Sequence, residues 1–188
     1  WLIKQIYEKG LLYKGYTIQP YSPVAGTGLS SHELNQPGTY QDVTDTSITA
    51  QFKAIESSLP SSLKGKIPLY FLAWTTTPWT LPSNTALTVG KNIDYAVVTT
   101  FNQYTYQPIR VVLAKALILK QFGKKFTLQK ELSTYKAGDK TIPYHVEGVL
   151  KGSDLLHIKY KQLWTESPLP LTNPEDAFRI ITGDFVTT

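Results

Sequence analysis

The side chains best suited to chemistry in this sequence lie close together, between residues 74 and 84. This stretch reads Trp-Thr-Thr-Thr-Pro-Trp-Thr-Leu-Pro-Ser-Asn. Its candidate functional groups are hydroxyls, indoles and one amide, carried by Thr75, Thr76, Thr77, Thr80, Trp74, Trp79 and Asn84. A threonine hydroxyl both donates and accepts hydrogen bonds, so a cluster of them is able to hold a ribose, an ester or a water molecule without using charge. The stretch is therefore the first candidate for a functional site.

Two prolines make this stretch a stiff bend. Pro78 and Pro82 fix their own φ angles, and each pushes the residue before it away from the helical region. Residues 68–73, Pro-Leu-Tyr-Phe-Leu-Ala, are apolar and aromatic, which predicts a buried strand. A polar bend after a core strand holds its side chains in fixed directions, as a binding site requires. The alternative is a structural turn whose threonines satisfy only neighbouring backbone groups.

The string 74–84 resembles the threonine-rich motif of the editing domain of isoleucyl-tRNA synthetases. In the related enzymes for valine and leucine the bend carries Thr-Thr-Arg-Pro, whereas here Thr77 is followed by Pro78, Trp79 and Thr80. A looser resemblance covers nearly the whole chain and includes residues 21–34, 42–52, 148–160 and 183–186. The resemblance implies a β-rich α+β fold, of the barrel-like editing type that isoleucyl-, valyl- and leucyl-tRNA synthetases share.

The activity that this resemblance implies is post-transfer editing, the hydrolysis of the ester in isoleucine tRNA that is mischarged with valine. One methylene in an apolar pocket is worth about 1–3 kcal/mol, and the choice between isoleucine and valine is the standard example of that limit. Thr75, Thr76 and Thr77 are thereby assigned to catalysis at the ester, the terminal ribose and the attacking water. The side chains assigned to substrate binding are Trp74, Trp79, Thr80 and Asn84. No cofactor is expected here, since ATP and Mg²⁺ belong to the catalytic domain of the parent ligase.

The resemblance also predicts that the chain has two parts. Residues 1–46 resemble the passage from the catalytic domain, and residues 47–188 resemble an editing domain that is incomplete at its C-terminal end. Many family members carry a Cys-x-x-Cys zinc knuckle in the passage, but Ser22 and Ala25 occupy those places here, so no metal is expected. The family continues with a Gly-Thr-Gly turn, a histidine and an aspartate, which would follow Thr188. We therefore expect residues 1–188 alone to hydrolyse the ester weakly or not at all.

A concentration of lysines predicts contact with RNA. The formal net charge is +5, and its excess lies between Arg110 and Lys140. Lysine attracts phosphates without reading base sequence. The candidate tRNA-binding residues are Lys115, Lys120, Lys124 and Lys125. The alternative is a solvated face without a ligand.

The elements that must position these residues are mostly short strands. Hydrophobic patterns predict strands over residues 43–52, 86–89, 95–101, 109–114, 126–132, 144–149 and 178–181. Helices are predicted over residues 1–9 and 115–122, with a helical turn over 152–155 and a helix start at Ser30. Residues 57–66 are predicted to form an exposed loop. Many strands with one clear helix among them favour a β-rich α+β domain.

Composition narrows the possible classes of protein. The chain has 188 residues, which suits one domain with a real core. Cysteine is absent, which excludes disulfides, thiol nucleophiles and the common structural zinc sites, and agrees with a cytoplasmic location. No apolar run has the length of a membrane span, so no membrane partner is expected.

Three other functions stay open at this point. A docking module would position the acceptor end of tRNA without hydrolysis, and would depend on the basic region. An unrelated β-rich interaction domain would use the threonine bend only as a structural turn. An editing domain of a valyl-tRNA synthetase would remove threonine, although Pro78 stands where that family has arginine.

Overall fold

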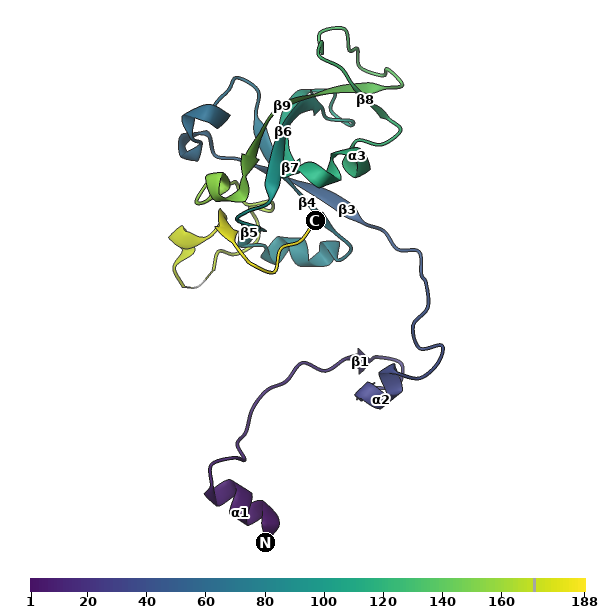
Figure 1. Cartoon of the computed structure of the whole chain (residues 1–188), viewed down its shortest axis with the longest axis vertical. Helices are drawn as coiled ribbons and strands as arrows, with labels where there is room; N and C mark the ends of the chain where they lie inside the picture. Colours follow the sequence, from purple (N-terminus) through teal and green to yellow (C-terminus); the bar gives the residue numbers. More distant parts are fainter. Residues whose placement is uncertain (171) are drawn as a thin grey trace. The chain divides into compact units, whose positions relative to one another are not determined.

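The computed structural model describes residues 1–170 and 172–188. The chain divides into two compact units, Trp1–Asp45 and Thr46–Thr188. This boundary lies one residue before the predicted one. Each unit is described separately below (Figure 1).

The first unit contains short elements, and none of its residues is buried. Its elements are α1 (Leu2–Glu8), β1 (Tyr21–Ser22), β2 (Thr27–Gly28) and α2 (Ser31–Leu34). The helix start predicted at Ser30 is confirmed: the Ser30 Oγ accepts a hydrogen bond from the Glu33 amide, and a Glu33 carboxylate oxygen accepts one from the Ser30 amide. The bond from the Ser30 amide, and a second one that the Ser30 hydroxyl donates to the same carboxylate, lower the pKa of the Glu33 carboxyl. In the turn between β1 and β2, the Ala25 amide donates to the Ser22 hydroxyl at 3.2 Å.

The second unit is built on a mixed sheet of six strands (Figure 1). In spatial order the strands are β3 (Ile48–Lys53), β4 (Leu69–Thr75), β7 (Pro108–Ala114), β6 (Asp94–Phe101), β9 (Ile142–Lys151) and β8 (Phe126–Leu128). The pairs β4–β7 and β8–β9 are parallel, and the other neighbours are antiparallel. A second, two-stranded parallel sheet pairs β5 (Ala86–Val89) with β10 (Arg179–Thr182).

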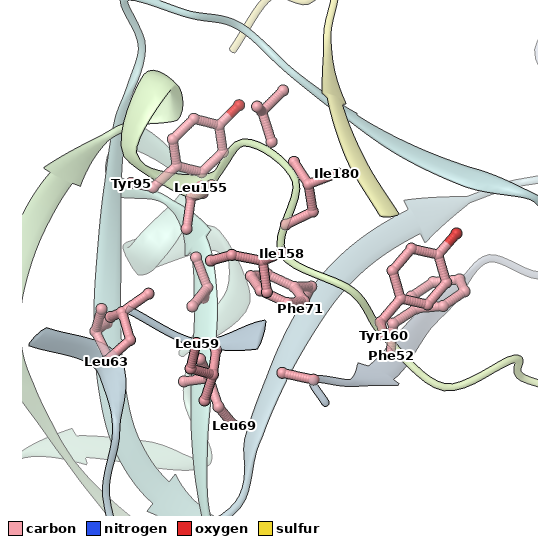
Figure 2. Close-up of a cluster of buried hydrophobic side chains, with 14 of the residues drawn as sticks. Phe52, Leu59, Leu63, Leu69, Phe71, Tyr95, Leu155, Ile158, Tyr160 and Ile180 are labelled. Carbon is pink, nitrogen blue, oxygen red and sulfur yellow. The ribbon is translucent and has the colours of Figure 1, made fainter. Parts of the chain in front are cut away.

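Apolar side chains cover both faces of the large sheet, which explains why its central strands are continuously hydrophobic. In β6 every residue from 95 to 100 is buried. One face packs into a core around Phe52, Phe71 and Tyr160 (Figure 2), where the rings of Phe52 and Tyr160 meet edge to face at 5.2 Å. The other face packs against Phe122 and Tyr144, whose rings stack at 4.6 Å.

The connections contain short helices, and some of them differ from expectation. They are η1 (Glu56–Ser58), η2 (Ser61–Leu63), η3 (Pro78–Ser83), η4 (Lys115–Leu117), α3 (Ile118–Gln121), η5 (Gly152–Leu155) and η6 (Pro174–Asp176). The prediction that residues 57–66 are simply an exposed loop is wrong, because η1 and η2 direct Leu59 and Leu63 into the core. The predicted helix 115–122 is split between η4 and α3, and the predicted strand 126–132 ends at Leu128.

The β-rich character of the predicted fold is confirmed, but in the described part of the chain the large sheet is open and does not form the predicted barrel. Within the described residues the strand order runs from β3 at one edge to β8 at the other, and these two edge strands do not pair. Barrel closure requires such a pairing. None of the helices in residues 1–170 and 172–188 is long and apolar enough to cross a membrane.

Candidate functional site

The threonine-rich stretch begins inside a strand. The last residues of β4 remain in the ladder with β3, where Trp74 pairs with Thr49 and Thr75 pairs with Ile48. Successive side chains of a strand point to opposite faces. Thr75 therefore lies on the face of β4 that carries Phe71, and Trp74 lies on the face that carries Leu72. The predicted strand over residues 68–73 is confirmed and continues to Thr75.

The three consecutive threonines form a tight hydrogen-bonded turn at the end of β4. The Thr77 amide donates to Thr75 Oγ1 at 3.0 Å, and the hydroxyls of Thr75 and Thr77 share a hydrogen bond at 3.1 Å. The shared bond uses one of the two hydroxyl protons, so the other proton remains for a ligand. Thr75 thus fixes the position of Thr77.

Thr76 differs from its two neighbours. Its side chain is exposed, and its hydroxyl makes no hydrogen bond with the residues that the structure describes. A hydroxyl on a fixed backbone without a protein partner is available to bind a ligand or a water molecule. Thr76 is therefore the least committed polar group of the turn.

The stretch continues as the short helix η3. Pro78 stands in its first turn, where a missing amide proton costs nothing. Thr80 closes this turn, since its Oγ1 and its amide both donate to the Thr77 carbonyl, at 2.8 and 3.1 Å. The Thr80 hydroxyl thereby contributes to the backbone geometry. The indole of Trp79 is 71% exposed, so it is accessible to a ligand beside the turn.

The amide side chain of Asn84 is used by the fold. Its Nδ2 donates to the Ala86 carbonyl at 2.9 Å, and its Oδ1 accepts from the Tyr160 hydroxyl at 2.6 Å. Burial raises the pKa of Tyr160, although the hydrogen bond to Asn84 acts in the opposite direction. Asn84 therefore anchors the end of η3 to the core, and both of its described side-chain hydrogen bonds are with residues other than the three threonines.

Trp74 lies beside a cavity on the opposite face of β4 from Thr75. The cavity has a volume of about 360 Å³ and is lined by Trp74, Leu72, Leu113 and Leu117, and also by residues 186–188 near the C-terminus. The Lys120 ammonium lies 5.4 Å from the centre of the Trp74 ring, a distance at which a cation is attracted to an indole.

Three of the four candidate lysines line one cavity, and the fourth lies elsewhere. Lys120, Lys124 and Lys125 line a cavity of about 310 Å³ between α3 and the start of β8. Lys115 does not line it. The ammonium of Lys115 instead adds to the effect of Lys151, whose hydrogen bond is the main reason why the pKa of Asp94 is lowered.

Arg110, at the start of the basic region of the sequence, adds no exposed charge to that region. Its side chain is buried, and its Nε and Nη2 donate to the Glu147 carboxylate at 2.7–3.0 Å. Its Nη1 donates to the Leu63 carbonyl at 2.7 Å. Burial alone would raise the pKa of Glu147, but hydrogen bonds from Arg110 and Thr99 outweigh it and lower this pKa.

Sequence reasoning missed Glu147 and Tyr160, whose partners are far away in the chain. A signal for Glu147 was present, since Arg110 interrupts the apolar run of β7 and a buried charge requires a partner.

No group of three or more histidine, aspartate or glutamate side chains in residues 1–170 and 172–188 is arranged to hold a metal ion.

Comparisons with known proteins agree with the motif. No family model matches the chain. The chain is 60% identical to the isoleucine–tRNA ligase of Bacteroides fragilis over 189 residues, 58% identical to that of Cytophaga hutchinsonii over 189 residues, and 56% identical to that of Bacteroides thetaiotaomicron over 198 residues. Each match covers 100% of this chain and 16% of the relative.

Through these matches the chain is similar over its whole length to a segment of aminoacyl-tRNA ligases. More particularly, it is a homologue of the isoleucine–tRNA ligases over its whole length, and it spans 16% of the length of those relatives.

Proposed function

We propose that residues 47–188 belong to the editing domain of an isoleucine–tRNA ligase, which hydrolyses the ester of isoleucine tRNA mischarged with valine. The observation that carries this proposal is the threonine turn at the end of β4, with the Thr75–Thr77 hydroxyl pair and the unpartnered hydroxyl of Thr76. The family supports it, because a ligase that must separate isoleucine from valine needs a second selection step.

The proposed reaction is the addition of water to the ester carbonyl of valyl-tRNA. The carbonyl carbon becomes tetrahedral, its oxygen takes negative charge, and the terminal ribose oxygen then leaves with a proton. The products are valine and uncharged tRNA. An aminoacyl ester is already activated, so a site that orients the water and stabilises the oxyanion is sufficient.

The geometry of the turn suggests a division of roles. The Thr76 hydroxyl binds the attacking water or the ester oxygen, since it has no competing partner in the protein. The Thr77 hydroxyl contacts the terminal ribose, with Thr75 holding it in place. Trp79 forms a wall beside the turn and Trp74 lines the cavity on the opposite face of β4, while Thr80 and Asn84 act on the substrate through the backbone that they hold. Isoleucine tRNA and the rest of the ligase, with its ATP and Mg²⁺, are the proposed partners.

The test is the double substitution Thr76→Ala/Thr77→Ala in a full-length isoleucine–tRNA ligase that carries this segment. Loss of one oriented polar group at such a site costs about 10²–10³ in rate, so we expect valyl-tRNA to accumulate while isoleucine activation is unchanged. The matched control is Ser61→Ala/Ser62→Ala, which removes two exposed hydroxyls from η2. Clearance of valyl-tRNA at the normal rate by the threonine variant would overturn the mechanism.

The second candidate is a tRNA-docking module without hydrolysis, which the lysine-lined cavity favours. The same experiment separates the two. A docking module predicts that the threonine variant and its control clear valyl-tRNA equally, whereas an editing site predicts a large difference between them.

A further inference from the structure

The connection between β8 and β9, the described residues 129–141, is a strap that contains no helix or strand (Figure 1). β8 and β9 are parallel neighbours, so the chain must run back along the sheet between them, and such a crossover usually contains a helix. Backbone hydrogen bonds hold the strap at its two ends. The Gln129 amide donates to the Tyr144 carbonyl at 2.9 Å, and the Ile142 amide, directly after the strap, donates to the Lys125 carbonyl at 2.8 Å.

Between its ends the strap has few attachments. The described hydrogen bonds of residues 130–141 join strap residues only to one another. The Tyr135 amide donates to the Leu132 carbonyl at 3.3 Å, and the Lys136 amide donates to an Asp139 carboxylate oxygen at 2.8 Å. Leu132 and Tyr135 are partly buried, and every other residue of the strap is exposed. The strap therefore keeps a local turn of its own, and its position over the sheet depends on two side chains.

The contact between the strap and the sheet is made by the ring of Tyr135. This ring lies 4.4 Å from the ring of Phe101, the last residue of β6, at an angle of 33°. Phe101 also lines the cavity between α3 and the start of β8. The Phe101 ring is thus shared between the strap and the cavity, and the position of Tyr135 decides how much of this ring is accessible.

The hydroxyl of Tyr135 opposes this closed arrangement. Its oxygen is buried and makes no hydrogen bond with the residues that the structure describes. Burial raises the pKa of Tyr135, and the neighbouring Tyr106 and Asp139 raise it further, so the hydroxyl keeps its proton. An enclosed hydroxyl without a partner loses its hydrogen bonds to water and gains none in return. The ring contact therefore favours the closed strap and the hydroxyl favours an open one, by free energies of similar size.

We propose that residues 129–141 form a lid, which opens when Tyr135 withdraws from Phe101 while both ends of the strap stay attached. The structure shows the closed state. Opening returns the Tyr135 hydroxyl to water and frees one side of the Phe101 ring beside the cavity. A ligand that binds this ring better in the open state would hold the lid open by the difference between its two affinities. The lid goes beyond the proposed function and does not depend on it.

The experiment measures how fast trypsin cleaves the strap of the 188-residue chain under native conditions, by mass spectrometry of the products. Trypsin cleaves after lysine, and the strap carries Lys130, Lys136 and Lys140. When opening and closing are fast relative to cleavage, the cleavage rate follows the population of the open form. Tyr135→Phe keeps the ring and removes the enclosed hydroxyl, so it should slow this cleavage by at least about fivefold, which corresponds to the low end of the cost of an unsatisfied buried group.

Two further variants complete the test. The matched control is Tyr104→Phe, which removes the hydroxyl of a tyrosine that is 81% exposed in the loop between β6 and β7 and should change strap cleavage by less than about twofold. Tyr135→Ala removes the ring contact with Phe101 and should speed strap cleavage. Arg110 is buried in β7, so cleavage after it requires global unfolding and should stay slow in both tyrosine-to-phenylalanine variants.

Strap cleavage in Tyr135→Phe that is as fast as in the unaltered chain, or faster, would overturn the proposal, because the hydroxyl would then not favour opening. An unaltered rate in Tyr135→Ala would overturn it as well, since Tyr135 would then not hold the strap closed. If Tyr135→Ala also speeds cleavage after Arg110, that variant unfolds globally, and the comparison of Tyr135→Phe with Tyr104→Phe decides. These rates involve no tRNA and no ester, so the lid and the proposed editing function are able to fail separately.

Discussion

The structure separates the roles of two adjacent threonines, and this separation is testable by Thr75→Val and Thr76→Val. Valine removes the hydroxyl and keeps the shape. Thr76 has no hydrogen-bond partner among the described residues, so its replacement should change the free energy of unfolding by less than about 0.5 kcal/mol. Thr75→Val removes bonds of 3.0 and 3.1 Å to Thr77. Each is worth about 0.5–1.5 kcal/mol, and water replaces part of this at an exposed turn, which leaves about 1 kcal/mol.

Two assays distinguish the variants. Thermal unfolding of the 188-residue chain should show an unchanged Tm for Thr76→Val and a decrease of about 3 °C for Thr75→Val. If the proposed editing function is right, deacylation of valyl-tRNA by the full-length ligase should fall by about 10²–10³ for Thr76→Val, because an oriented polar group is lost. If Thr76→Val lowers the Tm more than Thr75→Val does, or leaves deacylation unchanged, the assignment of the free hydroxyl is wrong.

Two further predictions concern the Arg110–Glu147 ion pair and the bond between Tyr160 and Asn84. The pKa of Glu147 is lowered in the folded chain, so its contribution to stability is complete above the unfolded pKa of 4.5 and is lost as the pH falls through the folded pKa. Urea unfolding at several pH values should show this loss of stability in the unaltered chain and a smaller loss in Glu147→Gln, which leaves Arg110 without its partner. If stability falls with pH equally in the two chains, Glu147 does not contribute in this way. Tyr160→Phe removes the 2.6 Å hydrogen bond to Asn84 and should lower the free energy of unfolding in urea by about 1–2 kcal/mol. The control is Tyr144→Phe, because Tyr144 is also buried but has no described side-chain hydrogen bond, and this variant should lower it clearly less.

The local features of this fold were predictable from sequence because their causes are local. The apolar run before Trp74 indicated the strand β4, and Ser30 with Glu33 indicated the start of α2. The position of the threonine turn followed from Pro78, which cannot continue a strand ladder. The internal bonds of the turn join residues two apart, a spacing at which threonine side chains commonly bond to the backbone.

The parts that were missed depend on contacts between distant residues. Arg110 is a basic residue in a basic region of the sequence, and only the fold reveals that Glu147, 37 positions away, neutralises it. Lys115 and Lys120 are close in sequence, but only Lys120 lines the cavity between α3 and β8, because η4 ends between the two lysines. The parallel pairing of β4 with β7 has no local signature, since it joins strands separated by three other elements. Leu59 and Leu63 are single apolar residues in a polar stretch, too few to form a periodic pattern.

In the proposed editing reaction, the anchoring of the threonine turn would allow hydroxyls alone to support hydrolysis. The turn is held at one end by the pairing of Thr75 with Ile48, and at the other by Asn84, which the buried Tyr160 hydroxyl holds. A site that provides neither a strong nucleophile nor a charge must gain its rate from positioning, and positioning requires a backbone that does not rearrange during the reaction. It follows that Tyr160→Phe should slow deacylation as well as lower stability, although Tyr160 lies in the core and does not contact the ester. Its effect on the rate should remain smaller than that of Thr76→Val, because it loosens the frame and leaves the reacting groups present.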